Sequence, residues 1–320
     1  MNDIIVSICC ITYNHEKYIA HALESFVKQK TDFKFEVIVH DDVSTDNTRK
    51  IIDSYVERYP EIIRTIYQVE NQYSKGVRIM DNIVVPTAKG KYIAICEGDD
   101  FWNDDYKLQK QVDYMESHPE CTLCIHNSLK VDLEGKQIGQ INTVEKSRIV
   151  SCEEVILGDG AFCSTNSIMM PKKIMESLPQ YLEIISNDYA KQIYCASQGT
   201  CYCFADVMSA YRVGVEGSWS KRVKANRLKH AEYTEIVVKM LKEFDEYTEK
   251  RYSPTVEVQL VNFELKIKLI REQYREILRS NRLRNCINKK GVKRRVIIYT
   301  KILLGCFAPK LVDLIQKVKK

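Results

Sequence analysis

Three acidic residues gather at the end of an apolar run in the first third of the chain. Glu97, Asp99 and Asp100 directly follow Tyr92-Ile93-Ala94-Ile95-Cys96, a run that predicts a buried strand. Like charges this close repel each other unless a cation lies between them, and hard oxygen ligands suit Mg²⁺ or Mn²⁺. Such an ion can also carry a diphosphate and offset the charge of a phosphate leaving group. The alternative is a solvated turn, because Gly-Asp-Asp is also typical loop sequence.

The elements that must position these carboxylates alternate between strands and helices. Apolar runs predict strands at 4–11, 35–39, 63–69 and 92–96. We expect Asn14 and Ser44 to cap the first two intervening helices and a third helix to begin near Val77. This order implies an α/β fold with a mostly parallel, twisted sheet and helices on both faces. Ligands of such sheets bind at the carboxyl ends of the strands.

That rule brings three polar segments to one edge of the sheet. Thr12-Tyr13-Asn14 follows the first strand, His40-Asp41-Asp42 follows the second, and the acidic group at 97–100 follows the fourth. Their convergence favours a metal and nucleotide site over a solvated turn. Lys75-Gly76-Val77-Arg78 precedes a predicted helix, so its amides and Arg78 could approach a diphosphate or ribose; a solvated basic turn is the alternative there.

Composition indicates an ordinary soluble protein. The chain has 320 residues, of which 45% are hydrophobic and 28% charged, enough for one large domain or two smaller ones. The first residues lack a basic region followed by a long apolar stretch, so we expect no signal peptide and a cytoplasmic location. Twelve cysteines fit that compartment if they are reduced.

The last part of the chain is strongly basic. Residues 279–320 hold thirteen Lys or Arg and one acid, so they carry +12 of a net +5 and the remaining residues carry −7. An apolar stretch at 296–308 is too short to span a bilayer but long enough to lie in its interface. We expect peripheral attachment to an anionic inner leaflet; the alternative is a pair of helices packed on the rest of the protein. Without interleaved aromatics or a known module, the tail does not indicate nucleic-acid binding.

Residues beyond Trp219 read as helical. Apolar residues between 260 and 277 mark one face of a long helix, which must be covered by the preceding helix or by a second copy in a homodimer.

Three motifs resemble a known family in both order and spacing. Residues 6–14, 40–46 and 97–100 resemble the nucleotide-binding half of glycosyltransferase family 2, and the resemblance continues more weakly through Asn187-Asp188-Tyr189 and Tyr211-Arg212 to about Trp219. It implies a GT-A fold for residues 1–219, with a nucleotide-sugar-binding half at 1–105 and an acceptor half at 106–219, followed by a helical region at 220–320. It also implies inverting transfer from a nucleotide diphosphate sugar by single displacement.

The resemblance also implies roles for single residues. Asp41 would accept a hydrogen bond from a uracil ring and Thr12 and Tyr13 would line the base, and we expect Asn14, Asp42, Arg78 and Asp99 at the nucleotide as well. Asp99 and Asp100 match the family's metal motif, where Glu97 replaces a more usual aspartate. Asp188 matches the general base, at the start of a predicted helix; an Asp there is also favourable without chemistry.

Residues around the acceptor are less well marked. The segment with Ser164, Thr165 and Asn166 resembles the loop that borders the acceptor pocket, and Trp219 either belongs to that region or packs its loop on the sheet. The chain departs from the family at Gly214, where many relatives carry a histidine that completes the metal shell.

The leading interpretation is therefore a glycosyltransferase that uses Mn²⁺ or Mg²⁺ and a nucleotide-sugar donor, with UDP-sugars the expected donors. The acceptor would be a glycan or a lipid-linked sugar, as in the synthesis of a surface or capsular polysaccharide. Two alternatives remain open from sequence: a nucleotidyltransferase of related topology, which would release pyrophosphate, and a catalytically silent scaffold that binds nucleotide sugars.

Overall fold

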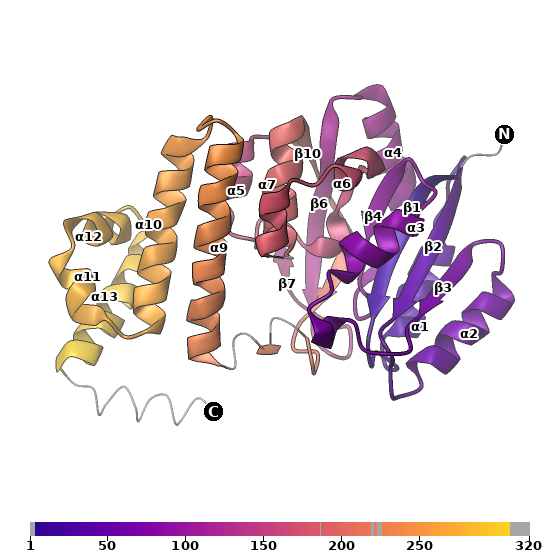
Figure 1. Ribbon diagram of the computed structural model, residues 1–320, viewed down its shortest axis with the longest axis horizontal. Coiled ribbons are helices and arrows are strands. Elements are labelled where there is room, and N and C mark those ends of the chain that lie inside the picture. The colour runs from indigo at the N-terminus through magenta and orange to yellow at the C-terminus, as the bar shows by residue number, and fades with distance from the viewer. Residues whose placement is uncertain (1–3, 186, 219–220, 223–225, 308–320) are drawn as a thin grey trace. The chain divides into compact units, whose positions relative to one another are not determined.

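The chain folds into two compact units. The computed structural model describes residues 4–185, 187–218, 221–222 and 226–307. The first unit is Met1–Val215 and the second is Glu216–Lys320. Figure 1 shows the sheet of the first unit and the helices of the second.

One sheet forms the centre of the first unit. Its strands are β1 (Ile4–Thr12), β2 (Lys34–Asp41), β3 (Ile63–Tyr67), β4 (Tyr92–Ile95), β5 (Phe101–Trp102), β6 (Cys121–Val131), β7 (Gln137–Ile141), β8 (Arg148–Val150), β9 (Met169–Pro171) and β10 (Thr200–Arg212). Their order is β3-β2-β1-β4-β9-β6-β10-β5, with β7 beside β6 and β8 beside β10. The first four strands are mutually parallel, β9 runs antiparallel to β4 and β6, and β10 is parallel to β6. The expected α/β sheet is confirmed. Each antiparallel pair of these strands includes at least one strand from β6 to β10.

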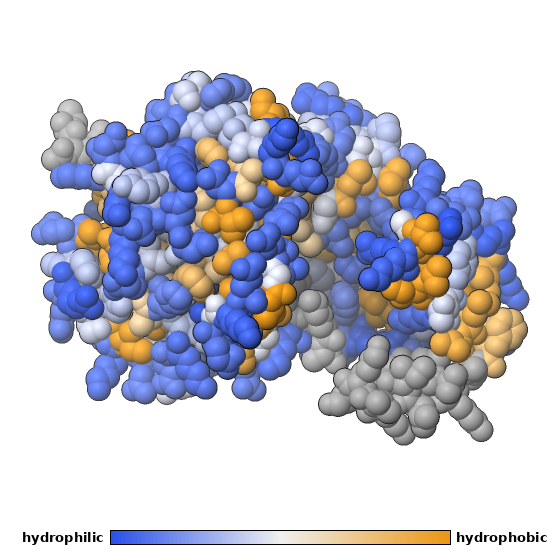
Figure 2. All heavy atoms as spheres, turned by 180° about the vertical axis from the view of Figure 1, so that it is seen from behind, coloured by the Kyte–Doolittle hydropathy of each residue, from blue (hydrophilic) through white to orange (hydrophobic). Residues whose placement is uncertain are grey.

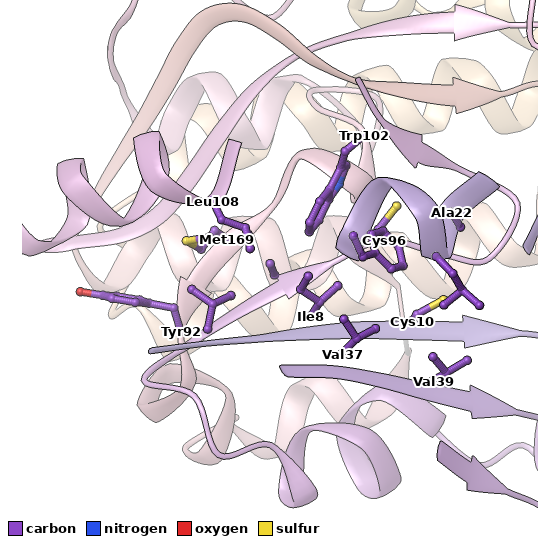
Figure 3. Close-up of a cluster of buried hydrophobic side chains, with 14 of the residues drawn as sticks. Ile8, Cys10, Ala22, Val37, Val39, Tyr92, Cys96, Trp102, Leu108 and Met169 are labelled. Atoms are coloured by element: carbon purple, nitrogen blue, oxygen red, sulfur yellow. The ribbon is translucent and has the colours of Figure 1, made fainter. Parts of the chain in front are cut away.

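Helices and helical turns cover this sheet. They are α1 (Ile19–Val27), α2 (Thr48–Arg58), η1 (Tyr73–Lys75), η2 (Met80–Val84), α3 (Val85–Thr87), α4 (Lys107–Ser117), α5 (Cys152–Leu157), η3 (Thr165–Ser167), α6 (Lys172–Glu176), η4 (Gln180–Ile184) and α7 (Asp188–Gln198). Strand β1 is buried on both faces, because Ile8 and Cys10 face one side, Ser7 and Cys9 the other, and all four are inaccessible. Figure 3 shows the first of these faces packed with Val37, Trp102 and their neighbours.

Local signals near the site differ from the expectation in one respect. The residues that precede α1 and α2 as their caps are Tyr18 and Asn47, so the predicted caps Asn14 and Ser44 are wrong. Both residues are used instead to join the loops after β1 and β2, because the Asn14 amide donates to Ser44 Oγ at 2.8 Å. The helix expected near Val77 begins a few residues later, as the π-helical turn η2.

The second unit is helical. It consists of α9 (Arg227–Tyr247), α10 (Ser253–Ile270), α11 (Tyr274–Arg279), α12 (Asn281–Asn288) and α13 (Val292–Phe307). Helices α9 and α10 lie side by side, and α10 to α13 share a small core around Leu265, Ile277 and Ile302. Figure 2 shows hydrophobic patches between the hydrophilic side chains of the protein surface. Within the described residues, no helix is both long and apolar enough to cross a bilayer.

Candidate active site

Three loops meet at the carboxyl edge of the parallel strands. Thr12 and Asp41 end β1 and β2 as direct partners across the sheet, and the Asp42 amide donates to the Thr12 carbonyl at 3.1 Å. The Gly98 amide donates to the carbonyl of Ile11 at 3.0 Å, which attaches the acidic loop after β4 to the same edge. The convergence that the sequence predicts is therefore present in the structure.

The glycine in the acidic loop permits a close approach. A Cβ on Gly98 would lie 2.8 Å from Thr12 Oγ1 and 2.9 Å from Thr12 Cβ, distances that real side chains essentially never reach. The hydroxyl of Thr12 is buried and has no hydrogen-bond partner among the residues that the structure describes. The loops after β1 and β4 are thus packed against each other, with Glu97 and Asp99 on either side of the contact.

Asp41 is held by its own loop. The side chain is buried, and its two oxygens accept hydrogen bonds from the Ser44 hydroxyl at 2.5 Å and the Ser44 amide at 3.1 Å. Asn14 accepts from the Thr45 amide at 2.7 Å, and its backbone has a φ of 56°, which Asn adopts more readily than most residues. Tyr13, between Thr12 and Asn14, is exposed at this edge.

Asp42 positions the loop that leads to Arg78. Its buried carboxylate accepts hydrogen bonds from the amides of Gln72 at 2.7 Å and Tyr73 at 3.0 Å. Both oxygens are therefore occupied by the backbone at the start of η1. The following residue, Val43, has a φ of 66°, a costly conformation for a β-branched residue that often accompanies functional loops.

Asp100 points into the protein. It is buried, and its carboxylate accepts hydrogen bonds from Asn166 Nδ2 at 3.0 Å and from the Arg212 amide at 2.8 Å. Burial and the charge of Asp99 raise the pKa of Asp100. Arg212 also donates from Nε to the Asp99 carbonyl at 2.9 Å. Asp100 and Arg212 thus fix the acidic loop, whereas the carboxylates of Asp99, which is largely covered, and of Glu97, which is exposed, accept no hydrogen bond within the described residues and remain free for a ligand.

The environments of those two carboxylates differ. His15 Nε2 lies 4.0 Å from Asp99 Oδ2, and both side chains are largely covered. Glu97 is exposed at the mouth of the site. Partial desolvation by the walls around it and then the charges of Asp99 and Asp188 raise the pKa of Glu97, while the Lys191 ammonium opposes the rise. The pKa of Glu97 thus responds to charges on the loop after β4 and on helix α7.

Asp188 begins α7, as the sequence predicts. The preceding Asn187 caps the helix by accepting a hydrogen bond from the Ala190 amide at 2.7 Å. The Thr165 hydroxyl donates to Asp188 Oδ2, and both side chains are partly exposed. A carboxylate fixed in this way, at the surface and beside the acidic loop, can accept a proton from a bound hydroxyl.

The other residues expected near the acceptor have different surroundings. Ser164 and Asn166 are buried: the Ser164 hydroxyl lies 2.5 Å from that of Ser128, and Asn166 accepts from the Ser209 hydroxyl at 2.7 Å. Both residues support the site from inside, and Thr165 alone of the three reaches its surface. Trp219 lies outside the described residues.

A cationic cluster beside the site was not singled out by the sequence as a unit. Lys191, one turn after Asp188 on α7, forms a buried ion pair with Asp81 at 2.6 Å. Arg78 lies 3.8 Å from the other oxygen of Asp81 and donates to the Leu182 carbonyl at 3.3 Å. Asp81 belongs to the π-helical turn η2, a feature often found at functional sites. No pattern in the sequence predicts this irregular turn, so no sequence signal marks the cluster in advance.

The open carboxylates suit a divalent cation of the Mg²⁺ or Mn²⁺ type. Asp99 and Glu97 supply hard oxygen ligands, and the buried Nδ1 of His15 next to them has no hydrogen-bond partner within the described segments. In the described part of the chain, no three His, Cys, Asp or Glu side chains form a ready metal cluster. The residues fit an ion that takes one or two protein carboxylates and completes its shell with phosphate oxygens and water, as Mg²⁺ commonly does.

Comparison with known proteins identifies the family. A model described as glycosyl transferase family 2 matches residues 7–178, more than half of the chain. The chain belongs to glycosyl transferase family 2. All the carboxylates at the carboxyl edge of the sheet fall within the matched residues, whereas Asp188 follows them.

Several bacterial proteins are similar in sequence. An uncharacterized protein of Mycobacterium tuberculosis is 35% identical over 218 residues, which are 67% of this chain and 60% of the relative, so the match spans less than two thirds of that relative's length. The putative teichuronic acid biosynthesis glycosyltransferase TuaG of Bacillus subtilis is 26% identical over 242 residues, 72% of this chain and 88% of TuaG. A UDP-Glc:alpha-D-GlcNAc-diphosphoundecaprenol beta-1,3-glucosyltransferase of Escherichia coli, WfgD, is 35% identical over 116 residues, 36% of this chain and 42% of WfgD.

Solved structures share the fold. TarS 1-349 of S. aureus, in complex with UDP, has a TM-score of 0.60 at 18% identity and covers 97% of this chain and 83% of its own. The mannosyltransferase PcManGT of Pyrobaculum calidifontis, in complex with GDP-Man and Mn²⁺, has a TM-score of 0.57 at 15% identity, with 95% and 81% covered. Together with the family match, these likenesses confirm the expected GT-A fold.

Proposed function

We propose that this family 2 member is a metal-dependent, inverting glycosyltransferase that moves a sugar from a nucleotide diphosphate donor, with UDP-sugars the first choice, to a hydroxyl of an acceptor. The observation that carries the proposal is that neighbouring residues of η3 contact both segments: the Thr165 hydroxyl donates to Asp188 at the start of α7, and Asn166 Nδ2 donates to Asp100 of the acidic loop at 3.0 Å. A general base and the leaving-group site would thus face one shared space. The UDP complex of TarS and the donor named for WfgD support the choice of UDP.

In this reaction each open residue has a distinct task. Asp188, oriented by Thr165, takes the proton of the acceptor hydroxyl as that oxygen bonds to the anomeric carbon. The bond from that carbon to the diphosphate oxygen breaks, and the nucleoside diphosphate leaves with the electron pair. Asp41 and Tyr13 would contact the base. Arg78, which lies beside Asp81, would approach the ribose or diphosphate.

Asp99, with Glu97 beside it, would hold Mn²⁺ or Mg²⁺ at the diphosphate. Such an ion offsets the negative charge that develops on the leaving group. Asp100 keeps Asp99 in place from below through the backbone of the acidic loop, because its own oxygens are occupied by Asn166 and Arg212. The Mn²⁺ in the PcManGT complex supports a divalent ion for this fold.

We further propose a glycan or lipid-linked acceptor in the synthesis of a surface polysaccharide. TuaG carries teichuronic acid biosynthesis in its name, and WfgD is named for an acceptor on diphosphoundecaprenol. An enzyme attached to the bilayer reaches such an acceptor most simply, and this is the role that we propose for residues 279–320 on the cytoplasmic side.

A panel of nucleotide sugars tests the proposal. The full chain is incubated with each donor, Mn²⁺ and short lipid-linked acceptors, and the released nucleotide is measured for wild type and for Asp188→Asn. We expect UDP release that falls by a factor of about 10² to 10⁴ in the variant, because proton transfer is lost, with unchanged UDP affinity by calorimetry. Asp32→Asn is the control, since Asp32 is exposed in the loop before β2, at the other end of that strand.

Three results would count against this function. Equal rates for wild type and Asp188→Asn would exclude Asp188 as the base. Release of the sugar 1-phosphate from the donor would indicate nucleotidyl transfer, since attack would then occur at the α-phosphorus. Binding of UDP-sugars without turnover on any acceptor would favour a silent scaffold.

A further inference from the structure

Helix α13 is seated on the second unit by one face. Ile302 is fully buried, and Ile298, Tyr299 and Cys306 pack against the core around Leu265 and Ile277. Gly305 lies against Tyr274 so closely that a Cβ there would be 2.0 Å from the ring. The rotation of the helix about its axis is therefore fixed by contacts within its own unit.

A neighbouring face of α13, about 110° around the helix from Ile302, exposes large apolar side chains. The exposed fractions are 67% for Val292, 56% for Val296, 49% for Leu303 and 80% for Phe307. At 3.6 residues per turn these four residues fall within about 60° of the helix circumference. They form a continuous stripe along the helix, which we call the α13 stripe. Exposed apolar stripes of this kind mark interaction sites, since single exposed apolar residues are ordinary but aligned sets are not.

Positive charge accompanies the stripe. Lys293, Arg294 and Lys301 are exposed and Arg295 is half-exposed, and α13 contains no Asp or Glu. A protein partner would need a matching acidic groove, whereas a bilayer of anionic lipid offers both an apolar interior and a negative surface. The helix is also too short and too charged to cross the bilayer, which leaves the interface.

We propose that the α13 stripe docks on the surface of an anionic phospholipid bilayer, with its apolar side chains among the acyl chains and its basic side chains at the headgroups. This inference deepens the proposed attachment of residues 279–320 by naming the face and the partner. It does not depend on sugar transfer.

Vesicle sedimentation of the full chain tests the docking surface. Wild type should bind vesicles of phosphatidylglycerol and phosphatidylcholine, bind pure phosphatidylcholine much less, and lose binding as salt rises. Val296→Ser with Leu303→Ser should weaken binding about tenfold or more, because two apolar side chains leave the interface. The matched control is Val258→Ser with Leu228→Ser, which removes the same residue types, 50% and 67% exposed, from α10 and α9.

The remaining outcomes would overturn the docking surface. Equal vesicle binding by wild type and the stripe variant would assign attachment to another segment. Absence of binding by wild type would refute attachment itself, and a change of oligomeric state in the stripe variant would make the stripe a contact between copies of the chain. UDP release from the donor in the presence of a soluble acceptor, measured in parallel, should stay unchanged in the stripe variant, so a failure of the proposed catalytic function is read separately.

Discussion

Lys107 is a fully buried lysine in the first unit, and its removal should abolish a pH dependence of stability. The ammonium donates to Gln111 Oε1 at 2.6 Å and lies 4.1 Å from the centre of the Trp102 ring. Burial lowers the pKa of Lys107 from 10.5 to about 7. Between pH 7 and pH 10.5 Lys107 is thus charged in the unfolded chain but largely neutral in the folded protein.

The size of the effect follows from that pKa. Between pH 7 and pH 10.5 the unfolded state binds more protons than the folded state, so the free energy of unfolding rises with pH by up to about 1.36 kcal/mol per unit. Because the folded-state pKa of Lys107 is about 7, the lysine is only partly deprotonated at pH 7, and the free energy of unfolding should rise by about 2 kcal/mol between pH 7 and pH 9. The contribution is absent above the unfolded pKa, and the full destabilisation is reached below the folded one.

Urea unfolding at pH 7, 8 and 9 measures this gain, with Trp102 fluorescence and circular dichroism as probes. Lys107→Met should be more stable relative to wild type at pH 7 than at pH 9, by about 2 kcal/mol. The lost hydrogen bond to Gln111 lowers the stability of the variant by an amount that does not vary over this range, so it does not affect the comparison. Lys50→Met, at an exposed position on α2, should follow wild type. Parallel curves for wild type and Lys107→Met would show that Lys107 keeps its proton in the fold and refute the reasoning.

Three further changes test the site. Gly98→Ala should destabilise the first unit by about 1–3 kcal/mol and weaken UDP binding in calorimetry, because its Cβ would displace Thr12. Unchanged UDP affinity would show that the contact between these two loops does not affect nucleotide binding. Lys191→Met leaves the Asp81 carboxylate buried and should lower the free energy of unfolding in urea by about 3–5 kcal/mol, and the double variant with Asp81→Asn should recover a large part of that loss. A double variant as unstable as Lys191→Met would contradict a direct ion pair between the two residues. Removal of divalent ions with EDTA should abolish UDP release and Mn²⁺ should restore it, so full activity in EDTA would exclude the metal.

The sequence predicts the parallel half of the fold because local signals specify it. Apolar runs separated by amphipathic stretches determine β1 to β4, and the edge rule then brings Asp41 and the acidic loop together without further information. Asp188 is also marked locally, by its place after Asn187 at the start of α7. Each of these features depends on residues close to one another in the chain.

Other features depend on partners that are distant in the sequence. Asp100 resembles its neighbour Asp99 in every local respect, and yet it turns inward because Asn166 and the Arg212 amide, 66 and 112 residues away, supply its hydrogen bonds. The inward position of Asn166 has the same origin, since it joins the acidic loop to β10. From residue type alone, Asp99 and Asp100 would both be expected to bind a ligand.

The distinction between Asp99 and Asp100 has a physical consequence for the site. A cation held by several protein carboxylates binds tightly without substrate, whereas one held by one or two binds weakly until phosphate oxygens complete its shell. Because Asp100 is engaged within the protein, Asp99 and Glu97 are left to hold an ion, and Glu97 also faces the negative charge of Asp188. A donor diphosphate adds the missing oxygen ligands, while Lys191 and Arg78, paired through Asp81, supply fixed positive charge nearby. The arrangement therefore favours binding of ion and donor together, and Mn²⁺ affinity should rise markedly when UDP is present.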